Sequence, residues 1–107
     1  MIITTSENIV GKKIVKTIGV VKGNTIRARH IGSDIAAGFR NIIGGEIKEY
    51  TKLIAESREQ CIDRMIEDAQ AKGANAIIMI RFSTSEIMKG AAELLAYGTA
   101  VIVEDDK

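Results

Sequence analysis

The stretch that decides the fold runs from residue 50 to residue 72 and reads YTKLIAESREQCIDRMIEDAQAK. Apolar or small side chains recur in it at steps of three and four, which places them on one face of an α-helix. Those positions are Tyr50, Leu53, Ile54, Ser57, Cys61, Ile62, Met65, Ile66 and Ala69. Lys72 puts a cation in the last turn and Gly73 supplies a C′ glycine. The pattern therefore predicts one long amphipathic helix over 50–72.

Two strands and a short helix are predicted before the long helix. Residues 13–21 and 25–31 are rich in β-branched side chains, and Lys22-Gly23-Asn24 between them has turn chemistry, so we expect a β-hairpin. Ser33-Asp34 then provides an N-cap for a short helix that ends at Gly44-Gly45. Gly19, inside the first strand, indicates a β-bulge or a close backbone approach.

Two more strands are predicted after the long helix. Residues 75–82 are almost continuously apolar, residues 83–90 are polar and suit a loop, and residues 94–103 are apolar on both faces. The order ββ-α-α-ββ predicts a single α+β domain over 1–107, with an antiparallel or mixed sheet covered by one long and one short helix. Helices on one face leave the other apolar face uncovered, so we expect a closed homo-oligomer that buries it between copies.

Composition excludes several classes of protein. The 107 residues, 46% hydrophobic and 27% charged, are ordinary for one folded domain, and a single cysteine excludes an internal disulfide framework. The first residues lack a signal-peptide pattern and the longest apolar run, 76–80, is too short to span a bilayer, so we expect a soluble, cytoplasmic protein with no membrane partner. Glycine-rich nucleotide-binding motifs are absent from the sequence.

Charge is distributed unevenly along the chain. Residues 1–53 hold nine Lys or Arg and four Asp or Glu, whereas residues 54–107 hold six and ten. This difference in charge between the two halves could attract an anion or could pair one copy head to tail with another. Alternatively, the charges could simply belong to solvated faces. Nucleic-acid binding is not expected, because the isoelectric point is near 7.8 and no aromatic residues alternate with the basic ones.

A few residues could carry chemistry. Cys61 lies on the apolar stripe of the long helix and is interpreted as a buried core residue rather than a metal ligand. His30 is either a structural histidine or a ligand. Arg81 interrupts an apolar strand, so it either pairs with an acid, with Glu46 and Glu86 as candidates, or lies in solvent, or binds an anion at a subunit interface.

The chain resembles the YbjQ-like family over essentially its whole length. The motifs that carry the resemblance are Phe39-Arg40-Asn41-Ile42-Ile43-Gly44-Gly45-Glu46, Gly73-Ala74-Asn75-Ala76, Arg81-Phe82 and Tyr97-Gly98-Thr99-Ala100-Val101. The resemblance implies a ring-shaped pentamer of small α+β subunits and a heavy-metal-binding label without an established enzyme activity. The fold is also similar to that of dodecin subunits, which hold flavins, but a shared fold does not transfer function.

Three functional hypotheses follow from these residues and the resemblance. The leading one is a non-enzymatic, homo-oligomeric binding module with its ligand, a heavy-metal ion or a small anion, at subunit interfaces. Glu46, Arg81 and Tyr50 are the candidate ligand-binding residues, and His30 and Cys61 are weaker candidates for a metal. A cryptic enzyme that uses Glu46, Tyr50 and Arg81 is the second hypothesis, and a scaffold without a ligand is the third.

Overall fold

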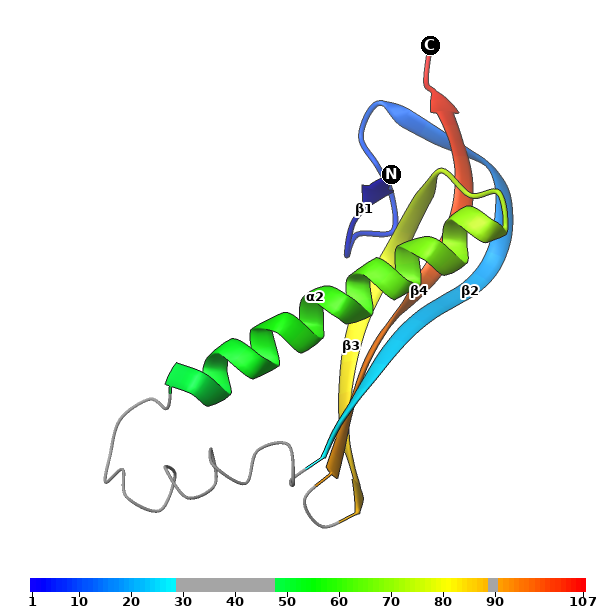
Figure 1. The fold of residues 1–107 in the computed structure, drawn as a ribbon. Coiled ribbons are helices and arrows are strands. Elements are labelled where there is room, and N and C mark those ends of the chain that lie inside the picture. Colours follow the sequence, from blue (N-terminus) through cyan, green and yellow to red (C-terminus); the bar gives the residue numbers. More distant parts are fainter. Residues whose placement is uncertain (29–47, 89–90) are drawn as a thin grey trace.

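In the part of the chain that the structure describes, one helix packs on a four-stranded mixed sheet. The computed structural model describes residues 1–28, 48–88 and 91–107. Its elements are β1 (Ile2–Ile3), β2 (Lys12–Ala28), α2 (Lys48–Ala71), β3 (Ala76–Met88) and β4 (Ala91–Asp105). The strand order is β1-β3-β4-β2, and α2 crosses one face of the sheet diagonally (Figure 1). The predicted α+β class is confirmed, and the long helix predicted over 50–72 is found within two residues of those bounds.

The sheet is organised around β4. This strand pairs antiparallel with β2 along the full length of both, from Lys12 opposite Asp105 to Ala28 opposite Ala91. On its other side it pairs antiparallel with β3, and the short β1 pairs parallel with the start of β3. The parallel pair of β1 and β3 makes the sheet mixed, and a mixed sheet was one of the two predicted alternatives.

The hairpin predicted within the first half of the chain is wrong, because β2 runs through the predicted turn as one strand. Gly23 lies opposite Ala96 in the ladder and serves helix packing instead of chain reversal. A Cβ atom at this position would lie 2.2 Å from the carbonyl oxygen of Cys61 and 2.5 Å from the backbone nitrogen of Met65. From the sequence alone, a glycine that makes room for a helix cannot be distinguished from a glycine that forms a turn. The predicted short helix over 33–43 lies outside the described residues.

The loop predicted over 83–90 is also wrong for most of its length. β3 continues to Met88, and β4 begins at Ala91, so both strands are longer than predicted. Ser83 lies opposite Leu95 and Ser85 opposite Glu93. Residues 81–87 are exposed, so polar side chains are tolerated in this part of the strand although they suggested a loop.

Two of the register shifts in the described sheet contain a residue with positive φ. The pairing of β2 and β4 shifts between Thr17 and Gly19, where Gly19 has φ 136°, so the predicted bulge is confirmed. A second shift lies between Ile78 and Arg81 of β3, and Met79 within it has φ 56°. Only a few per cent of residues other than glycine have a positive φ, so this second bulge was not predictable from the residue types.

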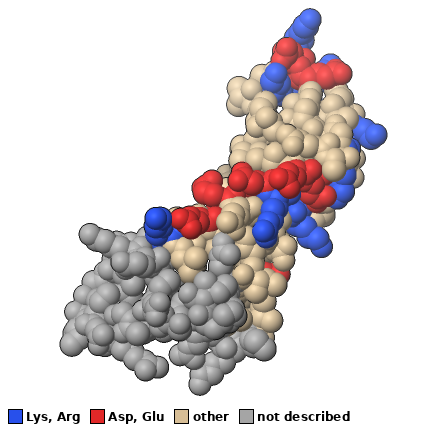
Figure 2. All heavy atoms as spheres, in the orientation of Figure 1, with Lys and Arg blue, Asp and Glu red and all other residues tan. Residues whose placement is uncertain are grey.

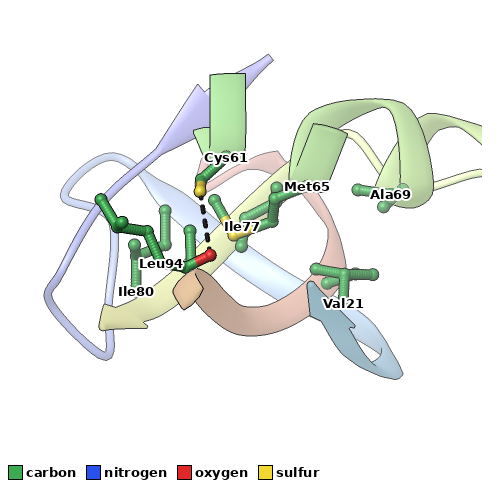
Figure 3. Packing of buried hydrophobic residues seen from close by; sticks show 10 residues of the cluster. Val21, Cys61, Met65, Ala69, Ile77, Ile80 and Leu94 are labelled. Carbon is green, nitrogen blue, oxygen red and sulfur yellow. Dashed lines mark hydrogen bonds between the residues drawn. The ribbon is translucent and has the colours of Figure 1, made fainter. Parts of the chain in front are cut away.

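Two clusters of buried side chains lie on opposite faces of the sheet. Beneath α2, Cys61, Met65 and Ala69 pack on side chains of all three long strands (Figure 3). On the other face a smaller cluster is covered by the segment around Ile9; its buried members are Ala76, Ile78, Val101 and Val103. The subunit is elongated, with a Cα radius of gyration of 17.4 Å. A compact domain of this length would have a radius of about 13 Å.

Candidate binding surface

The sheet face opposite α2 is the candidate binding surface, and we call it the open face. Strand alternation defines it, because Val21, Gly23 and Thr25 of β2 are buried on the helix side and the residues between them point the other way. Its residues, assigned by strand register, are Val20, Lys22, Asn24 and Ile26 of β2, Glu93, Leu95, Tyr97 and Thr99 of β4, and Arg81, Ser83 and Ser85 of β3.

Large apolar side chains of the open face are exposed. Val20 is 69% exposed, Ile26 is 56% exposed and Tyr97 is 38% exposed. Among the described residues, the segment around Ile9 covers one end of this side of the sheet and leaves these three side chains accessible. Part of the apolar surface predicted to exceed what the helices cover is therefore found on this face.

Polar side chains of neighbouring strands lie next to one another on the open face. Lys22 of β2 and Arg81 of β3 lie opposite Tyr97 of β4, one on each side, so two cations flank the tyrosine. Directly opposed residues of antiparallel strands have Cβ atoms about 4.5–5.5 Å apart, so the three side chains are neighbours. Nearby, the Asn24 side-chain amide donates a hydrogen bond of 3.0 Å to a carboxylate oxygen of Glu93.

Arg81 lies in solvent, which is one of the alternatives that its sequence position left open. Its Nη1 donates to the carbonyl oxygen of Thr5 at 3.0 Å and to that of Ile80 at 2.8 Å. The guanidinium thus ties the N-terminal segment to β3. In the described part of the chain Arg81 forms no ion pair with Glu86, and an exposed guanidinium needs none because water solvates it. Glu46, the other candidate acid, lies outside the described residues.

Cys61 is a core residue, as its place on the apolar stripe predicted. Its side chain is 0% exposed, and the thiol donates to the carbonyl oxygen of Leu94 at 3.2 Å, drawn as the dashed line in Figure 3. The Thr25 hydroxyl lies 3.5 Å from the same sulfur. A metal ion could reach this sulfur only if α2 moved away from the sheet.

The remaining predicted site residues are not brought together by the described structure. His30 and Glu46 lie outside the described residues, and Tyr50 lies in the first turn of α2, where its side chain is not described. Over residues 1–28, 48–88 and 91–107, no group of three or more His, Cys, Asp or Glu side chains could hold a metal ion. A metal site within this part of one chain is thus unsupported.

Asn75 has a structural role that sequence reasoning missed. Its side-chain nitrogen donates to the carbonyl oxygen of Val103 at 2.9 Å, and its side-chain oxygen accepts from the amide nitrogen of Val103 at 2.8 Å. The amide group therefore pairs with β4 as a backbone peptide would, directly before β3 begins. The signal was present in Gly73-Ala74-Asn75-Ala76, because asparagine is the residue whose side chain copies a peptide group.

Acidic side chains form a band over the solvent side of α2, with Lys and Arg beside it (Figure 2). The exposed acids are Glu56, Glu59, Asp63 and Glu67. At the far end of the sheet Lys12 forms an ion pair with Asp105, and this hydrogen bond and charge lower the pKa of the Asp105 carboxyl below its ordinary value. None of the helices in the described residues is long and apolar enough to span a membrane.

A family profile matches residues 1–104 and carries the description "Putative heavy-metal-binding" for the YbjQ family. The chain is 61% identical over 104 residues to a UPF0145 protein of Dehalococcoides mccartyi, a match that covers 97% of this chain and 100% of that one. It is 56% identical over 106 residues to a UPF0145 protein of Clostridioides difficile, covering 99% and 95%. The resemblance stated from the motifs is therefore confirmed.

A solved structure is similar in fold. A protein of unknown function from Pediococcus pentosaceus superposes with a TM-score of 0.64, covering 97% of this chain and 98% of that one. The two sequences are 16% identical, so this similarity supports the fold alone. The family description names heavy-metal binding and no reaction, and its UPF0145 members carry no activity in their names.

Proposed function

Because this chain belongs to the YbjQ family, we propose that it is a non-enzymatic binding module that assembles into a closed ring, a pentamer, in the cytoplasm. The ligand of this ring lies between subunits, and heavy-metal ions are its leading class. The single observation that carries the proposal is the open face, on which large apolar side chains are exposed in an elongated subunit.

Burial of the open face against a second copy removes an unfavourable surface. Val20, Ile26 and Tyr97 would each gain stabilisation on burial, because apolar area removed from water contributes about 25 cal/mol per Å². Cyclic symmetry uses the same patches on every copy, so a ring would satisfy all subunits at once. The elongated shape supports this, since a chain with too little internal core gains most from its neighbours.

Heavy-metal binding in this ring needs ligands from more than one subunit. The described residues of one chain hold no group of three potential ligands, and the Cys61 thiol is buried and hydrogen-bonded. Rotational symmetry repeats each side chain around the axis, so one His30 or Glu46 per chain near the axis would supply several ligands. These two residues are accordingly our candidate metal ligands.

The lateral row of Lys22, Tyr97 and Arg81 favours a second candidate, a ring that binds a small anion. Two cationic side chains, one on each side of Tyr97 in the ladder, offer donors to a phosphate or carboxylate. Titration with inorganic phosphate, followed by backbone amide shifts, tests it. Lys22→Ala should weaken the response severalfold, whereas Lys13→Ala, at another exposed position of β2, should leave it unchanged. Equal responses in both variants would remove this candidate.

Native mass spectrometry of the protein, purified without added metal or chelator, tests the main proposal. A five-fold mass with an excess that matches a metal ion supports ring and ligand together, whereas a five-fold mass without excess supports the ring and contradicts the resident metal. A monomer contradicts the ring.

A matched pair of substitutions tests which face is buried. Val20→Asp, on the open face, should break the assembly, and Val10→Asp should not, because Val10 is 102% exposed and lies in a turn outside the open face. Assembly that survives Val20→Asp would show that another surface is used. The enzyme alternative predicts that Glu46→Gln assembles normally but loses the conversion of a metabolite.

A further inference from the structure

The outer edge of β2 is the feature from which a further property can be inferred. β2 is the last strand in the sheet order, and within the described residues it pairs with β4 alone. Its other side therefore presents backbone N–H and C=O groups that a further strand could pair with. Exposed edges of this kind lead to edge-to-edge association unless the protein blocks them.

Three charged side chains bind the middle of this edge, two from α2 and one from the residue directly after its end, and we call them the capping row. They are Arg64, Asp68 and Lys72. Arg64 Nη1 donates to the carbonyl oxygen of Asn24, the backbone N–H of Lys22 donates to Asp68 Oδ2 at 3.2 Å, and Lys72 Nζ donates to the carbonyl oxygen of Val20 at 3.4 Å. The row thus supplies a donor, an acceptor and a donor to three of the backbone groups that a paired strand would engage.

The spacings of helix and strand explain why three consecutive contacts form. Arg64 and Asp68 are four residues apart, which is about 6 Å along a helix, and Lys72 follows four residues later, directly after the end of α2. Their partners in β2 are two residues apart, which is about 6.8 Å along an antiparallel strand. The small difference falls within the reach of long side chains. The helix runs antiparallel to β2, so the order of the contacts is preserved along both elements.

Packing beneath the helix holds the capping row in position. The neighbouring stripe of Cys61, Met65 and Ala69 is buried over the sheet, and Gly23 lets the backbone of α2 approach β2 closely. One stripe of the helix therefore covers the face of β2 while the next reaches around its edge. Asp68 also forms an ion pair with Lys72, with 3.3 Å between the charged atoms, which joins two members of the row.

We propose that the capping row closes the middle of the β2 edge to strand addition by a second copy of this chain. Each exposed charged contact contributes little by itself, but an incoming strand must displace all three to complete its own ladder. The edge thus contains a pairing site for an extended strand, and α2 occupies it within the same subunit. Association is thereby directed away from open-ended growth through edges, independently of whether the open face forms a ring.

The test replaces the row by alanine in Arg64→Ala/Asp68→Ala/Lys72→Ala. The matched control is Lys52→Ala/Arg58→Ala/Asp63→Ala, which removes the same three residue types from exposed positions of α2 outside the row. Analytical ultracentrifugation over a concentration series measures mass, and thioflavin fluorescence reports extended β-pairing. We expect about a twofold or larger rise in weight-average mass for the row variant relative to wild type and control.

Hydrogen exchange at the amide of Lys22 supplies the second measurement. At the lowest protein concentration of the series, where a second strand does not yet protect this amide, loss of the Asp68 acceptor should speed the exchange by about tenfold, the value of one charge-assisted hydrogen bond. If the triple variant unfolds, the same mass and exchange measurements compare Asp68→Ala with Asp63→Ala as its control.

Three results would overturn the proposal: unchanged exchange at Lys22, faster exchange with unchanged mass, or an equal rise in mass in variant and control. Each variant's mass is compared with the mass of the wild-type protein. A monomeric wild type would therefore refute the ring, and the test of the capping row would still compare variant with wild type.

Discussion

Gly23→Ala is the substitution that tests the packing account most directly. The added methyl group would lie 2.2 Å from the Cys61 carbonyl oxygen, 2.5 Å from the Met65 nitrogen and 2.8 Å from the Arg64 Cβ atom. Two of these atoms are backbone, so no rotamer change relieves the overlap and α2 must move away from β2. An ordinary contact of about 3.2–3.4 Å requires a displacement of about 1 Å.

The cost of that displacement can be estimated from its parts. Overpacking of a core costs about 1–3 kcal/mol, and sometimes more when backbone must move. Looser contacts of the capping row with the β2 edge add about 1–2 kcal/mol for its three members, whereas alanine gains about 0.5–1 kcal/mol over glycine in a strand. We therefore expect Gly23→Ala to lower the free energy of unfolding by about 2–4 kcal/mol, or the melting temperature by about 10–20 °C.

Chemical denaturation at fixed protein concentration measures this loss, and two other glycines calibrate it. Gly11→Ala meets nothing within 4 Å and bears only the cost of φ +84°, about 1 kcal/mol. Gly98→Ala meets Cγ2 of Ile77 at 2.8 Å and the carbonyl oxygen of Ile78 at 3.0 Å, longer distances than at Gly23, so its cost should fall between the two. A loss for Gly23→Ala no greater than that for Gly11→Ala would refute the close helix approach.

Three further predictions concern side-chain contacts. Asn75→Asp keeps the acceptor for the Val103 amide but places a carboxylate against the Val103 carbonyl, so thermal unfolding should show a loss of about 1–3 kcal/mol; an unchanged melting temperature would contradict the double hydrogen bond. The pKa of Asp105 is lowered by Lys12, so this carboxylate stabilises the fold above its unfolded value of 3.8 and loses that effect as pH falls through the folded pKa. Asp105→Asn should therefore flatten the dependence of stability on pH below about 4, and an unaltered slope would count against the ion pair. The Cys61 thiol should react with a disulfide reagent only at the rate of opening of the fold, and reaction as fast as that of a free thiol would show that it is accessible.

Predictability of the fold differed between helix and sheet for a physical reason. The long helix was predictable because three- and four-residue steps over six turns define one buried face, and Cys61, Met65 and Ala69 lie on it as expected. The sheet was divided wrongly at Gly23 and at Ser83. Glycine and serine are typical of turns, yet here one admits a helix and the other lies on an exposed strand.

The candidate site was predictable in kind but not in its residues. Excess apolar surface was inferred from the last strand, and the open face confirms it, but its most exposed member, Val20, was not singled out. Arg81 was recognised as unusual, whereas its bond to the carbonyl of Thr5 depends on an N-terminal segment 76 residues away in the chain. Side-chain partners at such separation are set by strand order, which no local pattern encodes.

By itself, the sequence determined the α+β class, the long helix with its buried stripe, the core position of Cys61 and the surplus of apolar surface. Periodicity and composition encode each of these through contacts that repeat every few residues. Only the tertiary structure decided that β2 is a single strand, that Gly23 makes room for α2, and that Arg64, Asp68 and Lys72 cap the β2 edge. Those features arise where two elements meet, because the match between a four-residue helical step and a two-residue strand step exists only once α2 lies beside β2.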